Sequence, residues 1–252
     1  MPADYTDAPL IEALCEFRFE PARSWDWTIS ELVFARIRDQ MPIRQEQRTI
    51  EFGLADGQIV PPLPPGLSRV QFLRQDGSAL IQIGTDYLGV NHLRPYPDWN
   101  AFSNLIFEHL DIYAEIAQPK SLVKIGLRYI NKIEVPTTAP GEKLKLSDYL
   151  QALPSVPPTL QRNVIQSFIQ RVEIGNAEAQ GTLVLQSGSL PAEHEGCLPF
   201  LLDLDFVTTP GEQLPLDQAR QWITRAHEEI ELAFEACIGD QARLLFGDKH
   251  HG

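Results

Sequence analysis

The sequence lacks the long apolar run of a membrane-spanning helix, because no stretch approaches the roughly 20 residues that such a helix needs. Its N-terminus, MPADYTDAPL, also lacks the basic and then apolar order of a signal peptide. Cysteine is scarce. Cys15, Cys197 and Cys237 are odd in number, far apart and free of CxxC spacing, which favours reduced thiols over a disulfide framework. We therefore expect a soluble, cytoplasmic protein with no membrane association.

The motifs of common catalytic sites are absent as well. There is no GxGxxG or GxxxxGK phosphate-binding loop, no GxSxG nucleophile elbow and no HExxH zinc motif. The nearest approach to the last is HEEIE at 227–231, where Glu231 replaces the second histidine and so excludes a zincin site. His194 and Cys197 have a ligand-like spacing, but no second ligand pair is nearby. The sequence predicts no metal site and no cofactor.

Acidic residues outnumber basic ones, 34 to 21, which gives a formal net charge of −13. This charge opposes nonspecific attraction to phosphate backbones and anionic lipid, so nucleic acid is not an expected partner. The chain has 252 residues, 43% of them hydrophobic, which is enough for a sizeable core in one large domain or two small ones. We expect a folded globular protein whose partner is a protein or a small ligand.

The most informative segment is LVKIGLRYINKIEV at 122–135, because its alternation predicts one long strand with two chemically different faces. The apolar face is expected to contain Val123, Ile125, Leu127, Tyr129, Asn131, Ile133 and Val135. The charged face is expected to contain Lys124, Arg128, Lys132 and Glu134. A second segment, FLLDLDF at 200–206, repeats the pattern with the opposite sign, since Asp203 and Asp205 alternate with inward apolar residues. One sheet surface should therefore contain both cations and carboxylates.

The order of elements predicts an α+β fold with a mainly antiparallel, curved sheet and helices packed on one side. The first half should contain strands at 13–20, 48–54, 68–74, 79–84 and 87–92 and helices at 28–40 and 98–117. The second half should contain strands at 122–135, 164–174, 181–186 and 200–207 and helices at 146–152 and 216–237. We interpret 1–118 and 119–252 as two β-α-β(3–4)-α units that form one compact body. They are either an old duplication or a coincidental meander.

The charged residues include the candidate catalytic groups. Asp203 and Asp205 could hold a divalent cation, but cross-strand pairing with Arg128 or Lys132 is the favoured interpretation. An exposed pair of that kind adds at most about 1 kcal/mol to stability. His227 is a third candidate, for metal binding or proton transfer together with Glu231, although a histidine and a glutamate four residues apart usually form a surface contact worth a few tenths of a kcal/mol.

Other polar residues are candidates for binding. An amide at Asn131, on the apolar face, must find hydrogen-bond partners or cost about 1–3 kcal/mol, so it is either a structural clamp, which we favour, or a ligand contact. Asn91 and Tyr96 lie where a strand ends before a helix, a common place for recognition, although the prolines beside Tyr96 can simply stiffen the turn. Together with Arg128 and Lys132, these residues form the predicted set for ligand or partner binding.

Four segments of the chain carry a family resemblance: DAPLIEALCEFRF, IQIGTDYLGVNHLRPYPDW, IGLRYINKIEVP and AHEEIELAFEACIGD, with GLRYIN at 126–131 the most specific. Together they are similar to a sporadically distributed bacterial family of uncharacterised proteins of about this length. The resemblance spans nearly the whole chain and implies no activity, cofactor or catalytic residue. Patchy occurrence is typical of genes that travel horizontally, including those of defence and toxin–antitoxin systems.

Two functional hypotheses follow from these observations. The favoured one is a noncatalytic binding or regulatory module that recognises a protein partner or a small ligand, because a well-patterned domain lacks any catalytic constellation. The alternative is a metal-assisted hydrolase or nuclease-like enzyme that uses Asp203 and Asp205, with Arg128 and Lys132 stabilising developing negative charge.

Overall fold

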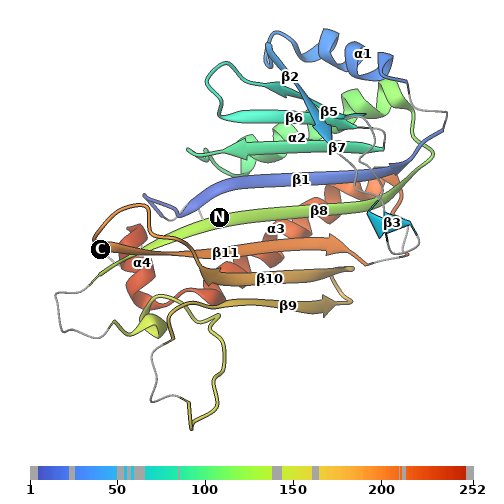
Figure 1. Ribbon diagram of the computed structural model, residues 1–252. Coiled ribbons are helices and arrows are strands. Elements are labelled where there is room, and N and C mark those ends of the chain that lie inside the picture. Colours follow the sequence, from blue (N-terminus) through green and yellow to red (C-terminus); the bar gives the residue numbers. More distant parts are fainter. Residues whose placement is uncertain are drawn as a thin grey trace.

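The computed structural model describes residues 5–22, 26–49, 54–55, 58–59, 66–84, 86–137, 144–160, 165–209, 211 and 214–247. Its main strands are β1 (Leu10–Glu20), β2 (Ile43–Thr49), β5 (Gly66–Leu73), β6 (Ala79–Gly84), β7 (Tyr87–Leu93), β8 (Ser121–Pro136), β9 (Ile169–Asn176), β10 (Gly181–Ser189) and β11 (Cys197–Thr208). They form one antiparallel sheet in the order β2-β5-β6-β7-β1-β8-β11-β10-β9 (Figure 1). The short strands β3 (Leu54–Ala55) and β4 (Gln58–Ile59) pair separately.

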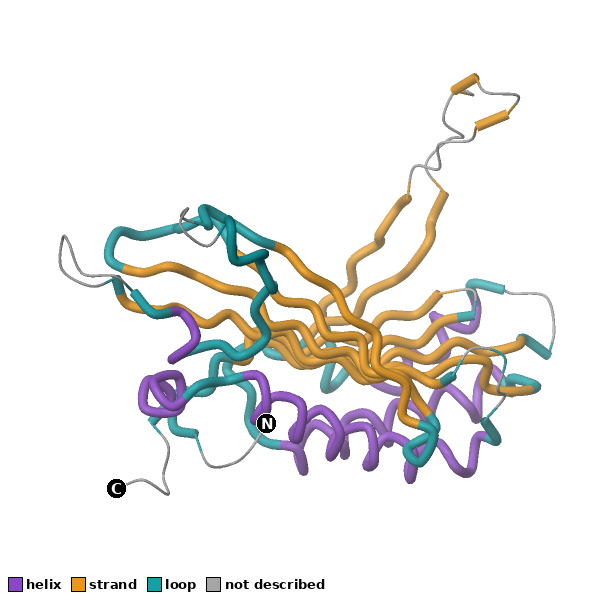
Figure 2. Tube along the Cα trace, turned by 90° about the horizontal axis from the view of Figure 1, so that it is seen from below, coloured by secondary structure: helices purple, strands orange, loops and turns teal. Residues whose placement is uncertain are grey.

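The helices lie together against one side of the sheet. They are α1 (Thr28–Ile37), α2 (Trp99–Ala117), α3 (Ala219–Cys237) and α4 (Asp240–Phe246), with short 3₁₀ helices η1 (Leu146–Asp148) and η2 (Leu216–Gln218). Figure 2 shows the sheet curving away from the helices, so that one surface, here called the helix face, is covered, whereas no helix of the described residues covers the other, the open face. The predicted α+β fold with a curved antiparallel sheet is confirmed. No helix in the described residues is long and apolar enough to cross a membrane.

The two long helices form where the sequence predicts amphipathic stripes. At the start of α2, the Asp98 carboxylate accepts a hydrogen bond of 2.7 Å from the Ala101 backbone N–H and so satisfies one free donor of the first turn. The apolar stripe of α3 packs on β8 and β11, and Trp222, Ile230 and Phe234 are fully buried. The Trp222 indole N–H also donates to the Gln180 carbonyl at 3.1 Å. The helix face is therefore the core of the protein.

The middle of the sheet follows the predicted alternation except at one residue. Val123 is 47% exposed, whereas Leu122 is buried in its place. The pairing of β1 with β8 shifts here, since Arg18 lies opposite Lys124 but Phe19 lies opposite Leu122. A β-bulge of this kind moves the chain by one residue and reverses the side-chain direction beyond it. The assignment of Val123 to the apolar face is therefore wrong.

Other differences concern boundaries. Strand β2 begins at Ile43 rather than at 48, and residues 50–53 of the predicted strand lie outside the described part of the chain. Strand β9 begins at Ile169, later than the predicted start at 164, a residue that also lies outside that part. The expected helix at 146–152 is reduced to the three residues of η1, and α4 was not predicted from the sequence. The strands of both predicted halves belong to one sheet, because β1 and β8 pair along most of their lengths.

Candidate binding surface on the open face

An ion pair between neighbouring strands occupies the middle of the open face. Arg128 on β8 donates from Nε and Nη2 to the two carboxylate oxygens of Asp203 on β11, at 2.8 and 2.6 Å. This pair was predicted from the two strand patterns. The Asp203 side chain is only 6% exposed and that of Arg128 is 41% exposed, so the expectation of an exposed pair is wrong for the carboxylate. The hydrogen bond to Asp203 raises the pKa of Arg128 further above its already high ordinary value.

Asp205 lies directly opposite Arg128 in the ladder, yet its carboxylate makes no hydrogen bond within the described part of the chain. Burial raises the pKa of Asp205 to about 6, and the nearby cations Arg128 and Lys124 reduce this effect only in part. The negative charges of Asp203 and Glu16 also raise the pKa of Asp205. Asp205 is thus a partly buried carboxylate without the hydrogen bonds that Asp203 receives from Arg128. A cation or hydrogen-bond donor at Asp205 would stabilise its charged form.

A glycine leaves space beside this carboxylate. Gly126 on β8 lies opposite Glu16 on β1 and Val207 on β11. A Cβ atom at Gly126 would lie 3.4 Å from Asp205 Oδ1 and 3.3 Å from Val207 Cγ1. The absence of a side chain at Gly126 therefore keeps carbon atoms away from an oxygen that accepts no hydrogen bond from the described residues.

The neighbouring part of the open face is a cluster around Tyr87. The Tyr87 hydroxyl donates to Glu16 at 2.7 Å. The guanidinium carbons of Arg69 and Arg18 lie 3.8 and 4.6 Å from the centre of the Tyr87 ring, within the range of cation–π contacts. Burial and the Glu16 carboxylate raise the pKa of Tyr87, so the phenol stays protonated and remains the donor.

Amide side chains extend the polar surface across four strands. Gln71 on β5 donates to Gln82 on β6 at 3.2 Å, and Gln82 donates to Asn91 on β7 at 3.1 Å. The Asn91 amide in turn donates to Glu12 on β1. Asn91 was a predicted binding residue, and the structure places it within this chain of hydrogen bonds. The two glutamines were missed, although each occupies an outward position in an alternating strand.

Lys132 lies on the same face, nearer the end of β8. Its ammonium group is 3.1 Å from a carboxylate oxygen of Glu134 and 3.1 Å from one of Glu193. Hydrogen bonds to these two groups raise the pKa of Lys132. Lys132 therefore does not pair with Asp203 or Asp205.

The remaining predicted residues lie on the helix face. The Tyr129 hydroxyl is 2.9 Å from His227 Nδ1 and 3.4 Å from the Tyr96 hydroxyl. The indole of Trp99 stacks on the imidazole at 3.9 Å between ring centres. Burial lowers the pKa of His227 to about 3, although its Nε2 lies 3.3 Å from a Glu231 carboxylate oxygen. His227 is a buried, neutral group, so the expectation of a surface contact is wrong.

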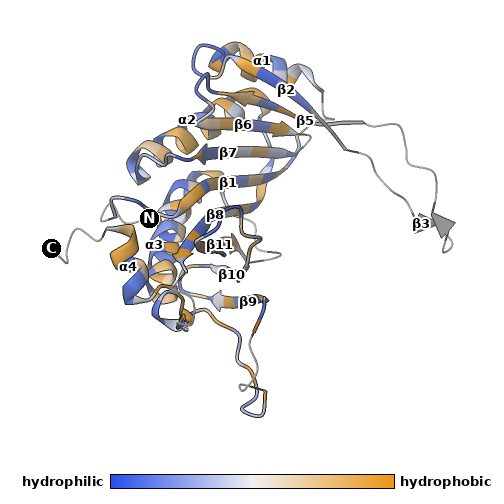
Figure 3. Ribbon diagram, turned by 60° about the vertical axis from the view of Figure 1, so that its left-hand side comes forward, coloured by the Kyte–Doolittle hydropathy of each residue, from blue (hydrophilic) through white to orange (hydrophobic). Residues whose placement is uncertain are grey.

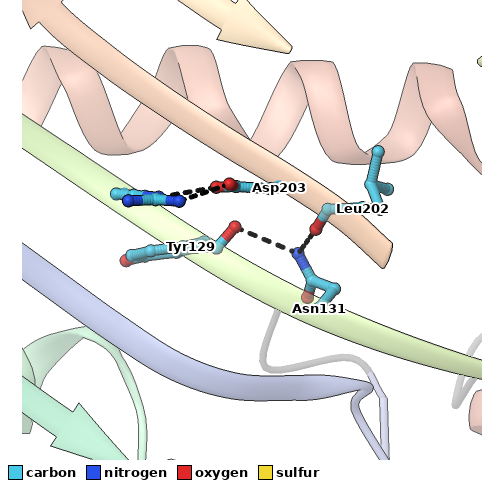
Figure 4. A network of polar contacts seen from close by, with 5 residues as sticks. Tyr129, Asn131, Leu202 and Asp203 are labelled. Atoms are coloured by element: carbon cyan, nitrogen blue, oxygen red, sulfur yellow. Dashed lines mark hydrogen bonds and ion pairs between the residues drawn. The ribbon is translucent and has the colours of Figure 1, made fainter. Parts of the chain in front are cut away.

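Asn131 is a residue of β8 on the helix face, and it lies opposite Leu202 of β11 (Figure 4). Its amide donates to the Leu202 carbonyl at 3.1 Å and, more weakly, to the Tyr129 carbonyl at 3.4 Å. These contacts are those of the predicted clamp. Its Oδ1 atom is buried and has no hydrogen-bond partner in the residues that the structure describes.

The sheet therefore divides the predicted site residues into two groups. Arg128, Lys132, Asn91, Asp203 and Asp205 lie on the open face. His227, Tyr96 and Asn131 lie on the helix face. A single catalytic site that uses both Asp205 and His227 is excluded by this arrangement.

A separate pocket of about 480 Å³ lies between η1 and the start of α4. It is lined by Lys145, Ser147, Asp148, Gln151, Ile238, Gly239, Asp240, Gln241 and Arg243. Lys145 and Asp148 already form an ion pair at 2.8 Å. None of the predicted site residues lines this pocket.

A scan against protein-family models finds no match, and a search of curated proteins likewise finds none. The resemblance to the bacterial family with GLRYIN stays a prediction. Within the described ranges, no three histidine, cysteine, aspartate or glutamate side chains are grouped so as to hold a metal ion.

Proposed function

We propose that the open face binds a protein segment or small ligand that presents an amine or guanidinium group to Asp205, without catalysis. The observation that supports this proposal is the Asp205 carboxylate, whose pKa of about 6 reflects burial without a hydrogen-bond partner among the described residues. A cationic donor would supply the missing interaction. The net charge of −13 would also attract such a partner over long range.

The surroundings of Asp205 favour binding over catalysis. Both oxygens of Asp203 are already used by Arg128, so Asp203 has little capacity left for a metal ion. His227, the residue predicted for proton transfer, is on the other side of the sheet. The alternative, a metal-assisted hydrolase using Asp203 and Asp205, gains no support from this arrangement.

The two halves of the chain meet beside this surface, and we infer that they are related by duplication. In each half the opening strand, β1 or β8, lies at the junction, and the later strands follow outward in reverse chain order. Each half then closes with a 19-residue helix, α2 or α3. Superposition of β1, β7, β6 and α2 on β8, β11, β10 and α3 tests this inference, and unrelated helix directions would contradict it.

Nuclear magnetic resonance tests the binding proposal with short arginine-containing peptides as probes and glutamate-containing peptides of equal length as controls. We expect saturable shifts at 126–128 and 203–205 with the arginine peptides only. Asp205→Asn should weaken binding about tenfold, which corresponds to the loss of one charge-assisted hydrogen bond.

Glu134→Gln provides the matched control, because it removes one negative charge from the same face at a site already paired with Lys132. Equal weakening by both variants would mean that only net charge matters and would refute the proposed role of Asp205. For the wild-type protein, affinity should also fall as the pH drops through 6, since Asp205 then becomes protonated. Binding that does not respond to this change would count against the proposal as well.

A further inference from the structure

The two borders of the sheet differ in chemistry. Strand β2, at one border, has the sequence IRQEQRT, and its Arg44 forms ion pairs with Glu31 and Glu46. Strand β9, at the other border, has the sequence IQRVEIGN (Figure 3). Natural border strands are usually protected from pairing by charged side chains, above all lysine, by proline or by a bulge. β9 contains no lysine or proline, and its ladder with β10 runs without a register shift. Its two charged residues, Arg171 and Glu173, have opposite signs, so they do not repel every partner strand.

The apolar side chains of β9 are exposed. Ile169 is 75% exposed, and Val172 and Ile174 are 45% and 49% exposed. Val172 and Ile174 point to the helix face, since they lie opposite Leu185 and Leu183 of β10, which contribute to the core. Ile169 points to the open face. A border strand with this much exposed apolar surface is typical of a strand that pairs with another chain.

The ladder between β9 and β10 defines which backbone N–H and C=O groups of β9 point away from β10. The Ser189 N–H donates to the Phe168 carbonyl at 2.9 Å, so this pair is hydrogen-bonded. Hydrogen-bonded pairs alternate in an antiparallel ladder. Gln170, Val172 and Ile174 therefore face β10, whereas Ile169, Arg171, Glu173 and Gly175 direct their N–H and C=O groups outward.

We propose that β9 pairs with β9 of a second copy of this chain, antiparallel and with Val172 opposite its own counterpart. The charges of β9 favour this register. With Val172 at the two-fold axis, Arg171 of each chain lies opposite Glu173 of the other, and both residues have outward backbone groups. The two residues already attract each other within one chain, at 2.6 Å, and are more than half exposed.

Neighbouring registers lose this complementarity. Centring the pair on Arg171 places arginine opposite arginine, and centring it on Glu173 places glutamate opposite glutamate, which is destabilising. In the proposed register, Ile169 lies opposite Gly175, whose position has open space around an added Cβ atom. The two copies would form one continuous sheet, and a two-fold axis perpendicular to that sheet would put both open faces on the same side. The inference goes beyond the proposed binding function and does not depend on it.

Analytical ultracentrifugation over a concentration series tests the charge pairing. We expect the wild-type chain to dimerise. Arg171→Glu and Glu173→Arg should each weaken the dimer about tenfold or more, because each places like charges opposite one another twice. The double variant R171E/E173R should recover the dimer, and an equimolar mixture of the two single variants should form heterodimers.

Cysteine crosslinking tests the register. In a non-hydrogen-bonded pair the two Cα atoms are about 4.5 Å apart, which is within the range of a disulfide. V172C should therefore form a covalent dimer on mild oxidation. R171C should not, because residue 171 of one copy lies opposite residue 173 of the other and two positions away from the second copy's residue 171. The wild-type chain with its native cysteines should not form a covalent dimer either. A wild-type chain that stays monomeric at every concentration would overturn the proposal. A dimer that is insensitive to charge reversal, or that crosslinks equally through R171C, would overturn it too. Unchanged circular dichroism of each variant shows that the monomer has folded.

Discussion

The Tyr129 hydroxyl lies 2.9 Å from His227 Nδ1 and so joins the middle of the sheet to α3. The other ring nitrogen of His227, Nε2, is 3.3 Å from a Glu231 oxygen, which can only accept a hydrogen bond when ionised. Nε2 therefore holds the proton of the neutral imidazole, and Nδ1 accepts from Tyr129. Burial raises the pKa of Tyr129 well above its ordinary value, so the phenol keeps the proton that it donates.

Removing this hydroxyl should destabilise the protein. Tyr129→Phe leaves the ring in place but deprives buried Nδ1 of its donor, which should cost about 1–2 kcal/mol of unfolding free energy. Urea denaturation at neutral pH measures the change. Tyr113→Phe is a suitable control, because Tyr113 is similarly buried but its hydroxyl forms no hydrogen bond in the described residues. Equal losses in both variants would contradict the assigned hydrogen bond.

The same histidine should make stability depend on pH. The pKa of His227 is about 3 in the folded protein and about 6.5 when the chain is unfolded. Between these values the unfolded state binds a proton that the folded state does not, so His227 makes stability fall as the pH falls from 6.5 toward 3. His227→Phe keeps a ring to stack on Trp99 but cannot titrate. Its unfolding free energy should therefore depend less steeply on pH in this range, as measured by urea denaturation at several pH values.

Asp205 should have the opposite effect. Its pKa is raised from 3.8 to about 6, so between these values the folded state holds a proton that the unfolded state has lost. Its contribution to stability therefore decreases as the pH rises through this range, whereas the contribution of His227 increases. Asp205→Asn should stabilise the protein at pH 7.5 by about 1 kcal/mol and increase the gain in stability from pH 4 to pH 7. A loss of stability at pH 7.5 would show that Asp205 has a partner that compensates its burial.

The predicted and observed structures agree where one local pattern decides the outcome. Alternation places Leu127 in the core and Arg128 outside it, and helical spacing identifies the buried side of α3. The bulge at Val123 could not be predicted, because it depends on how β1 and β8 fit together rather than on β8 alone. The late start of β9 depends in the same way on its pairing with β10.

The candidate site was predicted in part for a similar reason. The pairing of Arg128 with Asp203 follows from two strand patterns of opposite charge. The degree of burial of Asp203 depends on neighbouring side chains, which strand alternation does not report. The burial of His227 could not be predicted from the helical spacing of α3, since a polar residue at the edge of an apolar stripe can be either buried or exposed. Only the approach of Tyr129 and Trp99 makes it a core residue.

Phe234 tests the core position of α3. Its side chain is fully buried among aromatic neighbours, including Tyr5 and Phe246, whose ring centres lie 6.2 and 6.3 Å away. Phe234→Ala should cost about 3–5 kcal/mol, because it removes buried apolar surface and leaves a cavity. Leu232→Ala, at an exposed position of the same helix, should change stability by less than about 0.5 kcal/mol in the same denaturation experiment. A small loss for Phe234→Ala would place this side of α3 outside the core.

The Arg128–Asp203 pair should respond asymmetrically to mutation, because only the carboxylate is buried. Arg128→Ala leaves that carboxylate without its cation, and we expect a loss of about 2 kcal/mol, less than for a fully buried pair because Arg128 is half in solvent. Lys132→Ala, on the same strand and face, removes a cation from carboxylates that are themselves exposed and should cost no more than about 1 kcal/mol. R128L/D203L removes both charges together and should recover much of the loss of R128A. Urea denaturation of the set measures each step, and a double variant less stable than R128A would show that the two residues stabilise the open face through contacts other than their mutual pairing.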